Sequence, residues 1–256
     1  MTTKTSKEQQ LIPRLLVCIN PEEVATRAAA LFVSQAVQAI ADRGRFRVVL
    51  SGGSTPRRAY ELLTSPRWSS KIRWEAVEVF WGDERYVSAE DADSNYRMAR
   101  EAFLERVPLP EANIHPVPTG IEPAEAAAAY EETIRATFAA TTDIPRFDLI
   151  FLGLGANGHT ASLFPASPLL RETSRLVAAD YVQELDGWRV TMTAPLLNRG
   201  RTIAFLVTGQ DKAGVLREVV RGPYVPEVLP AQLIRPEDAE LLWIADTGAA
   251  SLIMRT

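Results

Sequence analysis

The chain has 256 residues, of which 46% are hydrophobic and 23% charged, the balance of an ordinary globular protein. This composition excludes a disulfide-stapled miniprotein, a disordered chain and a coiled coil, and the length suffices for one large domain or two small ones. With 28 Lys and Arg against 32 Asp and Glu, the net charge is -4, so no global positive field attracts nucleic acid or an anionic membrane.

The single cysteine, Cys18, lies in an apolar run and is expected to be a small buried hydrophobe. One cysteine permits no disulfide within the chain, which fits a reducing compartment. Residues 1–10 are polar and lack the apolar core of a signal peptide, and no stretch approaches the ~20 apolar residues of a membrane helix. We therefore expect a cytoplasmic protein that associates with neither membrane nor nucleic acid.

Short apolar runs alternate with longer amphipathic ones, a pattern that predicts βαβ units around a mostly parallel sheet. Most of the short runs are apolar throughout, as strands covered by helices on both sides require. The segment 188–193 alternates instead and is expected at an edge or in antiparallel pairing. The expected parallel strands are 15–19, 46–51, 76–81, 147–153, 203–208 and 241–245.

The first helix has clear end signals: Asn20 can cap it, Pro21 suits its first turn, Glu23 can reach back, and Gly44 ends it. Four more helices are expected, at 56–63, 95–107, 123–140 and 211–220. Neither an internal repeat nor a break in composition divides the chain, so a single domain over 13–256 is expected after a tail of 1–12.

A glycine-rich turn at 51–56 follows the second strand and opens a helix. Gly52 and Gly53 let the backbone approach a ligand, the hydroxyls of Ser54 and Thr55 can donate, and the helix N-terminus adds free amides and a positive dipole. These features suit a phosphate group, although a tight turn with a helix cap gives the same pattern. The lysine of a Walker loop and the third glycine of a dinucleotide fingerprint are both absent.

The segment 81–85 follows the third strand, where ligands bind in open α/β sheets. Arg85 can grip a phosphate or carboxylate with two bonds, and Asp83 could orient that arginine or a substrate hydroxyl. For Glu84 we expect a solvated loop position. The following 93–96 is typical of a helix start, with capping and substrate contact both open.

The loop 153–162 holds three glycines in six residues and delivers His159 to the end of a buried strand. A histidine of near-neutral pKa on such a loop is a natural general base. His115, the only other histidine, precedes a proline in an extended segment and is expected to be structural. Lys212, one of four lysines, follows another strand end and is a phosphate-binding candidate, with a plain surface charge as the alternative. No His/Cys cluster has metal-ligand spacing.

Taken together, these segments resemble the 6-phosphogluconolactonases, the lactone hydrolases of the oxidative pentose phosphate pathway. The likeness runs from about residue 15 to the C-terminal end and is most specific at 153–165, supported by 51–56, 81–85, 93–96 and 229–232. It implies a three-layer α/β/α, Rossmann-like domain shared with glucosamine-6-phosphate deaminases and ribose-5-phosphate isomerases. It also implies 6-phospho-D-glucono-1,5-lactone as the small-molecule substrate, no cofactor, no metal, and a monomer or weak homodimer.

The resemblance also implies roles for particular residues. His159 matches the catalytic base, and Asp83 and Asn157 complete the predicted catalytic set. Arg85 and Lys212 match phosphate ligands, and Gly53 and Thr55 match the phosphate-side loop. The predicted substrate contacts further include Gly52, Ser54 and Gly158.

One position departs from the family pattern, because the usual Asp-Gly-His triplet is Asn157-Gly158-His159 here. An asparagine cannot raise the basicity of a histidine as an anion can. Two alternatives stay open: a sugar-phosphate deaminase or isomerase of the same fold, and a non-catalytic sugar-phosphate sensing domain. An isomerase would want a carboxylate base near the loop, and a transcription regulator would need a helix-turn-helix segment, which the sequence lacks.

Overall fold

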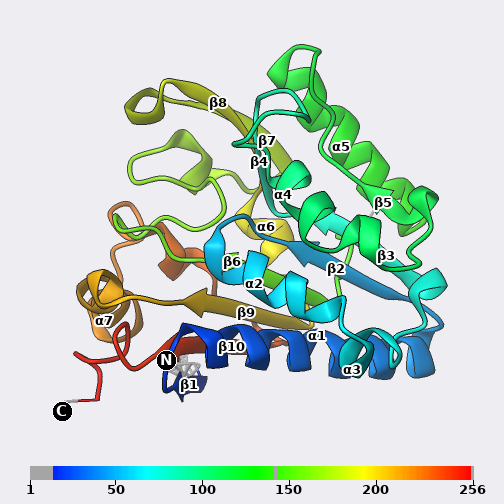
Figure 1. Cartoon of the computed structure of the whole chain (residues 1–256). Helices are drawn as coiled ribbons and strands as arrows, with labels where there is room; N and C mark the ends of the chain where they lie inside the picture. Colours follow the sequence, from blue (N-terminus) through cyan, green and yellow to red (C-terminus); the bar gives the residue numbers. More distant parts are fainter. Residues whose placement is uncertain (1–13, 141–142, 255–256) are drawn as a thin grey trace, which may run out of the picture.

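The computed structural model describes residues 14–140 and 143–254, so the expected tail at 1–12 lies outside the described residues. The chain builds two sheets, shown in Figure 1 with the smaller one at the top of the view. Every neighbouring pair in the large sheet is parallel. Its order is β1 (Arg14–Cys18), β10 (Glu240–Asp246), β9 (Thr202–Val207), β6 (Leu149–Gly153), β2 (Phe46–Leu50), β3 (Val77–Trp81) and β5 (Ile114–His115).

The small sheet is antiparallel, with the order β4 (Asp83–Arg85), β8 (Gly187–Met192) and β7 (Val177–Val182). The antiparallel pairing expected for 188–193 is thus confirmed, with β8 as the central strand. The expectation of a loop after β3 is wrong, because residues 83–85 turn away from the large sheet and form a strand that pairs with β8.

The helices are α1 (Pro21–Arg43), α2 (Ser54–Leu63), α3 (Pro66–Ser69), α4 (Asn95–Ala102), α5 (Pro123–Thr137), α6 (Ala194–Leu197) and α7 (Ala213–Arg221). The expected helix 95–107 splits into α4 and a 3-10 turn at Leu104–Arg106, and the expected helix 211–220 begins as the 3-10 turn Gln210–Lys212. Helix α2 starts two residues earlier than expected, so Ser54 and Thr55 lie in its first turn.

Helix α1 has the predicted ends. The Asn20 side chain accepts a hydrogen bond from the Glu23 amide at 2.9 Å, and Gly44 closes the helix with φ of 78°. Glu23 reaches back to the Ile19 amide at 2.8 Å. The expectation that no stretch approaches a membrane helix is wrong for α1, which is long and apolar enough to cross a membrane by length and composition alone. Its buried face, which includes Phe32, packs into the core.

Aromatic side chains mark the two covered faces of the large sheet. On one face, Tyr60 of α2 packs against Phe103 and against Phe151 of β6. Phe80 of β3 points to the opposite face and packs against Phe138, which follows α5. Because strand residues alternate between faces, the predicted three-layer α/β/α architecture with a mostly parallel sheet is confirmed.

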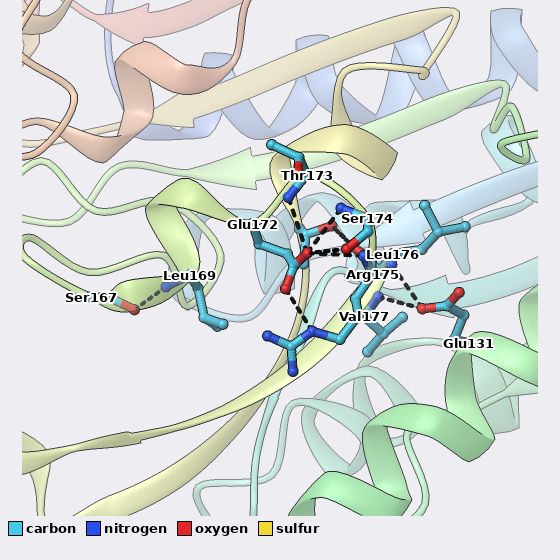
Figure 2. A network of polar contacts seen from close by, with 10 residues as sticks. Glu131, Ser167, Leu169, Glu172, Thr173, Ser174, Arg175, Leu176 and Val177 are labelled. Carbon is cyan, nitrogen blue, oxygen red and sulfur yellow. Dashed lines mark hydrogen bonds and ion pairs between the residues drawn. The ribbon is translucent and has the colours of Figure 1, made fainter.

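A network of carboxylates ties the small sheet to α5 (Figure 2). Glu131 of α5 accepts hydrogen bonds from the backbone amides of Leu176 and Val177, at 2.7 and 3.2 Å, where β7 begins. Just before this point, Glu172 accepts three backbone amides and the Arg175 guanidinium. These hydrogen bonds lower the pKa of the Glu172 carboxyl to about 2. The β7–β8 hairpin therefore has a fixed base.

Candidate active site

A cavity of about 380 Å³ opens at the carboxyl ends of β2, β6 and β9, the place where open α/β sheets bind ligands. The small sheet closes one side of it. Its walls bring together most of the side chains predicted for the site from distant parts of the sequence. Among the lining residues are Gly52, Gly53, Ser54, Thr55, Asp83, Arg85, His159 and Lys212.

The glycine-rich turn forms the N-terminus of α2 at the cavity wall. Gly53 is the N-cap residue, with φ of 107°, a conformation that favours glycine, and no side chain caps the helix. No acidic residue lies in the first turn, so the helix dipole keeps its attraction for an anion. A Cβ on Gly52 would fall 1.9 Å from Asn95 Oδ1, so this turn packs directly against the start of α4.

The neighbouring wall carries Thr55 and Thr208, whose hydroxyl oxygens lie 2.7 Å apart across α2 and β9. Lys212 follows β9, with its side chain largely covered, and its nearest carboxylate is Asp211 at 3.7 Å. Lys212 lines the cavity, which favours the ligand-binding interpretation over a plain surface charge.

Strand alternation sorts the three charged residues of β4. Asp83 and Arg85 line the cavity, and the Arg85 guanidinium donates to the Asp93 carbonyl at 2.8 Å. Glu84 points the other way and is only 2% exposed, so the solvated position expected for it is wrong. Its carboxylate accepts the backbone amides of Asn95 and Tyr96, both at 2.7 Å.

Glu84 thus joins β4 to the N-terminus of α4. Ser94 is the N-cap of that helix, and its hydroxyl accepts the Arg97 amide at 3.1 Å, so capping is confirmed for this segment. Burial raises the pKa of the Glu84 carboxyl to about 7, although hydrogen bonds from the Asn95 and Tyr96 amides act to lower it. The Asn95 side chain adds a bond to the Asp83 carbonyl at 2.9 Å.

His159 enters the cavity from the loop after β6 and stacks on Phe164, with ring centroids 4.3 Å apart. Burial lowers the pKa of His159 below its ordinary value of 6.5; the Asp83 carboxylate acts to raise it, and the charges of Lys212 and Arg85 lower it further. The ring is therefore neutral at physiological pH and can accept a proton.

Asn157 fixes which nitrogen of His159 can act. Its side-chain oxygen lies 2.6 Å from His159 Nδ1 and also accepts the His159 backbone amide at 3.2 Å. Because an amide oxygen only accepts, Nδ1 carries the proton and Nε2 keeps its lone pair. A Cβ on Gly155 would lie 2.0 Å from Nδ1, so only glycine leaves room for the ring.

Gly158 supports the loop from behind. Its φ is 81°, a Cβ there would fall 2.7 Å from Leu229, and its carbonyl accepts the Ala231 amide at 2.8 Å. Neither Gly158 nor Asn157 is among the described residues that line the cavity. The segment 229–232 therefore buttresses the histidine loop.

The cavity residues that were absent from the sequence-based set include Arg189, Asn95 and Ser162. Ser162 donates a hydrogen bond from its hydroxyl to the Asp83 carboxylate at 2.7 Å. Arg189 lies directly opposite Arg85 in the β4–β8 ladder. The alternation of 188–193 was a usable signal for Arg189, but the pairing partner of this strand was unknown.

Other candidates fall outside the cavity. His115 stacks on Phe80 with ring centroids 4.5 Å apart, which supports its structural assignment. Cys18 is buried and free, as expected. In the parts of the chain that the structure describes, no group of three or more His, Cys, Asp or Glu side chains could hold a metal ion.

Comparisons with known proteins identify the family of this chain. The model of the family described as glucosamine-6-phosphate isomerases/6-phosphogluconolactonase matches residues 19–243. The 6-phosphogluconolactonase of Synechocystis sp. is 43% identical over 242 residues, covering 93% of this chain and 98% of the relative. That of Nostoc sp. is 39% identical over 236 residues, covering 90% and 95%.

A solved structure, the 6-phosphogluconolactonase from Trypanosoma cruzi, superposes with a TM-score of 0.81 at 29% sequence identity. The superposition covers 93% of this chain and 96% of the other. Fold and sequence therefore point to the same family over nearly the whole chain.

Proposed function

Because the chain belongs to the glucosamine-6-phosphate isomerase/6-phosphogluconolactonase family, we propose that it hydrolyses 6-phospho-D-glucono-1,5-lactone to 6-phospho-D-gluconate, in the oxidative pentose phosphate pathway. The observation that carries the mechanism is the hydrogen bond between His159 and Asn157. It leaves Nε2 of a neutral imidazole available as a base in a cavity lined by cations.

In this mechanism, Nε2 of His159 takes a proton from a water molecule as the water oxygen attacks the lactone carbonyl. The tetrahedral intermediate collapses with breakage of the bond to the ring oxygen, which leaves as an alkoxide and recovers the proton from the imidazolium. Asp83 favours the protonated ring, so it stabilises the charge that His159 carries between the two transfers. Ser162 holds the Asp83 carboxylate in place.

The amides of Gly155 and Gly158 are not available to the oxyanion of the intermediate. The Gly155 amide donates to the His159 carbonyl at 2.8 Å, and the Gly158 amide donates to the Gly155 carbonyl at 3.0 Å. Both amides instead hold the loop in its shape around His159.

The substrate phosphate binds away from the carbonyl and supplies remote binding energy. Its proposed ligands are the Gly52–Thr55 turn at the N-terminus of α2, together with Arg85 and Lys212. A deaminase or isomerase of the same fold would need a carboxylate on the histidine loop, where this chain has Asn157. The proposal further includes a cytoplasmic location, no cofactor, and a monomer or weak homodimer.

The test is acid release from fresh 6-phosphogluconolactone in a weakly buffered solution, measured above spontaneous hydrolysis. We expect His159→Ala to lower the rate of hydrolysis by about 100- to 10,000-fold. His115→Gln is the matched control, because it changes the chain's only other histidine, which lies outside the cavity. If the wild type releases no acid, the lactonase is refuted and the sugar-phosphate sensing domain and the deaminase or isomerase are left. If His159→Ala turns over at nearly the wild-type rate, His159 is not the base.

A further inference from the structure

Two arginines face each other across the small sheet. Arg85 of β4 and Arg189 of β8 are direct partners in the antiparallel register, and both line the cavity. Side chains at directly opposed positions lie on the same face, with Cβ atoms about 4.5–5.5 Å apart. The strand register therefore holds two guanidinium groups together at one wall.

Within the described part of the chain, these two positive charges have no close carboxylate partner, although Asp180 of β7 lies opposite Arg189 in the ladder and its carboxylate accepts the Ser167 hydroxyl. Among the described residues, neither Arg85 nor Arg189 forms an ion pair within 4 Å; Arg85 donates to the Asp93 carbonyl and Arg189 to the Trp188 carbonyl at 2.9 Å. Like charges directly opposite each other in a ladder are destabilising. Burial and the charge of Arg85 lower the pKa of Arg189, and the nearby carboxylates of Asp83, Asp93 and Glu84 offset this effect only in part.

The local backbone makes room for the Arg189 side chain. A Cβ on Gly187 would stand 3.0 Å from Arg189 Nη1, tighter than ordinary contact. The strand that carries Arg189 pairs along its whole length with β7, whose base is fixed to α5 by Glu131 (Figure 2). The guanidinium is thus presented from a rigid element rather than from a loop tip, which reduces the entropy lost when it binds a ligand.

We propose that Arg189 is a substrate-binding residue that completes, with Arg85, a two-guanidinium clamp for the phosphoryl group. The clamp makes the enzyme select phosphorylated over unphosphorylated lactones. A phosphoryl dianion offers oxygens for both planar forks and neutralises the pair, whereas an unphosphorylated lactone leaves the repulsion in place. This inference rests on the proposed function, since it names a further residue for the same substrate.

The kinetic test compares Arg189→Ala, Arg189→Lys and Arg217→Ala on 6-phosphogluconolactone and on unphosphorylated gluconolactone. Arg217 is the matched control, because its replacement removes the same charge from an exposed pair with Glu218 outside the cavity. For Arg189→Ala we expect KM for the phosphorylated lactone to rise about 10- to 100-fold with kcat within about threefold. The unphosphorylated lactone should lose less than about threefold in kcat/KM, and Arg189→Lys should recover part of the affinity, since it keeps the charge and loses the fork.

An equal loss on both lactones would overturn the clamp, because it would place Arg189 at the reacting carbonyl or in the fold. Thermal unfolding of each variant separates these two causes, and Arg189→Lys provides a second readout if the alanine variant unfolds. Additive effects of Arg85→Ala and Arg189→Ala on phosphate binding would also count against a shared ligand, since groups that bind one ligand together couple.

A binding experiment keeps the failure of this inference distinct from a failure of the proposed function. Calorimetric titration with inorganic phosphate, and separately with 6-phosphogluconate, needs no turnover. Suppose that the wild type has no lactonase activity but binds these anions tightly, and that Arg189→Ala weakens this binding about tenfold or more. This result would refute the lactonase and retain the anion clamp. If the wild type is an active lactonase and Arg189→Ala binds the anions as tightly as the wild type does, the clamp alone is refuted.

Discussion

The asparagine beside His159, the proposed general base, gives the sharpest test of the proposed mechanism. In Asn157→Asp, a carboxylate replaces the amide whose oxygen lies 2.6 Å from His159 Nδ1. Two unit charges about 4 Å apart interact by ~4 kcal/mol at an effective dielectric constant of ~20, and one pKa unit corresponds to ~1.4 kcal/mol. Because residue 157 is exposed, solvent screens much of this energy, and we expect the pKa of His159 to rise by about one to two.

The direction of the change in activity follows because His159 can act as a base only when its ring is unprotonated. A higher pKa means that the basic form of His159 is lost by protonation at a higher pH, so the acidic limb of the kcat/KM profile moves to higher pH. In the wild type, burial places this limb below pH 6.5. On the limb, a displacement of the profile by about one pH unit lowers the rate of Asn157→Asp relative to the wild type by about tenfold, while the plateau near neutral to alkaline pH is preserved.

The assay is the pH profile of kcat/KM for wild type, Asn157→Asp and the control Ala156→Asp on the same phosphorylated lactone. Ala156 is also exposed, and an aspartate there adds the same charge outside the hydrogen bond to the ring. The control should shift the limb much less. A limb that stays in place or moves downward in Asn157→Asp, with activity intact, refutes the positioning role, and a collapse at every pH would mean that the amide contacts substrate or oxyanion.

Three further predictions concern the surroundings of the histidine, the phosphate ligands and the acid limit of stability. Gly155→Ala should lower kcat about 100-fold with an unchanged unfolding midpoint, because its Cβ would displace the His159 ring; unchanged kcat would contradict this crowding. Arg85→Ala and Lys212→Ala should each raise KM about tenfold or more for the phosphorylated lactone and spare gluconolactone, and equal losses on both would refute phosphate binding. The Glu172 carboxyl has a pKa of about 2 against an ordinary 4.5, so its stabilisation is present above about pH 4.5 and is lost as the pH falls toward 2. The difference in urea midpoint between wild type and Glu172→Gln should therefore narrow from about pH 6 to about pH 3.5, and a constant difference would contradict the assignment.

The parallel sheet was predictable because its strands are apolar on both faces. All six expected strands form within two residues of their predicted bounds, since runs such as 46–51 must be buried whatever surrounds them. Strand β7 was missed because Asp180 and the exposed Tyr181 interrupt its apolar run. Two-residue β5 is too short to leave any periodic signal.

The site was predictable where a single loop carries it, as at Gly52–Thr55 and at His159. It was not predictable where two distant strands meet. The alternation of 188–193 places Arg189 on one face of a strand, but only its register with Arg85 brings it to the cavity. Glu84 was misassigned for the same reason, because a loop leaves all its charges in solvent whereas a strand sends alternate ones in opposite directions.

That alternation makes the register of β4 the condition on which the site depends. A slip of one residue would turn Asp83 and Arg85 away from the cavity and bring Glu84 into it, placing a carboxylate at the proposed phosphate site. Strand β4 has only three residues and one paired edge, so its ladder alone holds the register weakly. The bonds from Glu84 to the amides of α4 fix it from the opposite face, which explains why a glutamate is buried there in spite of its raised pKa.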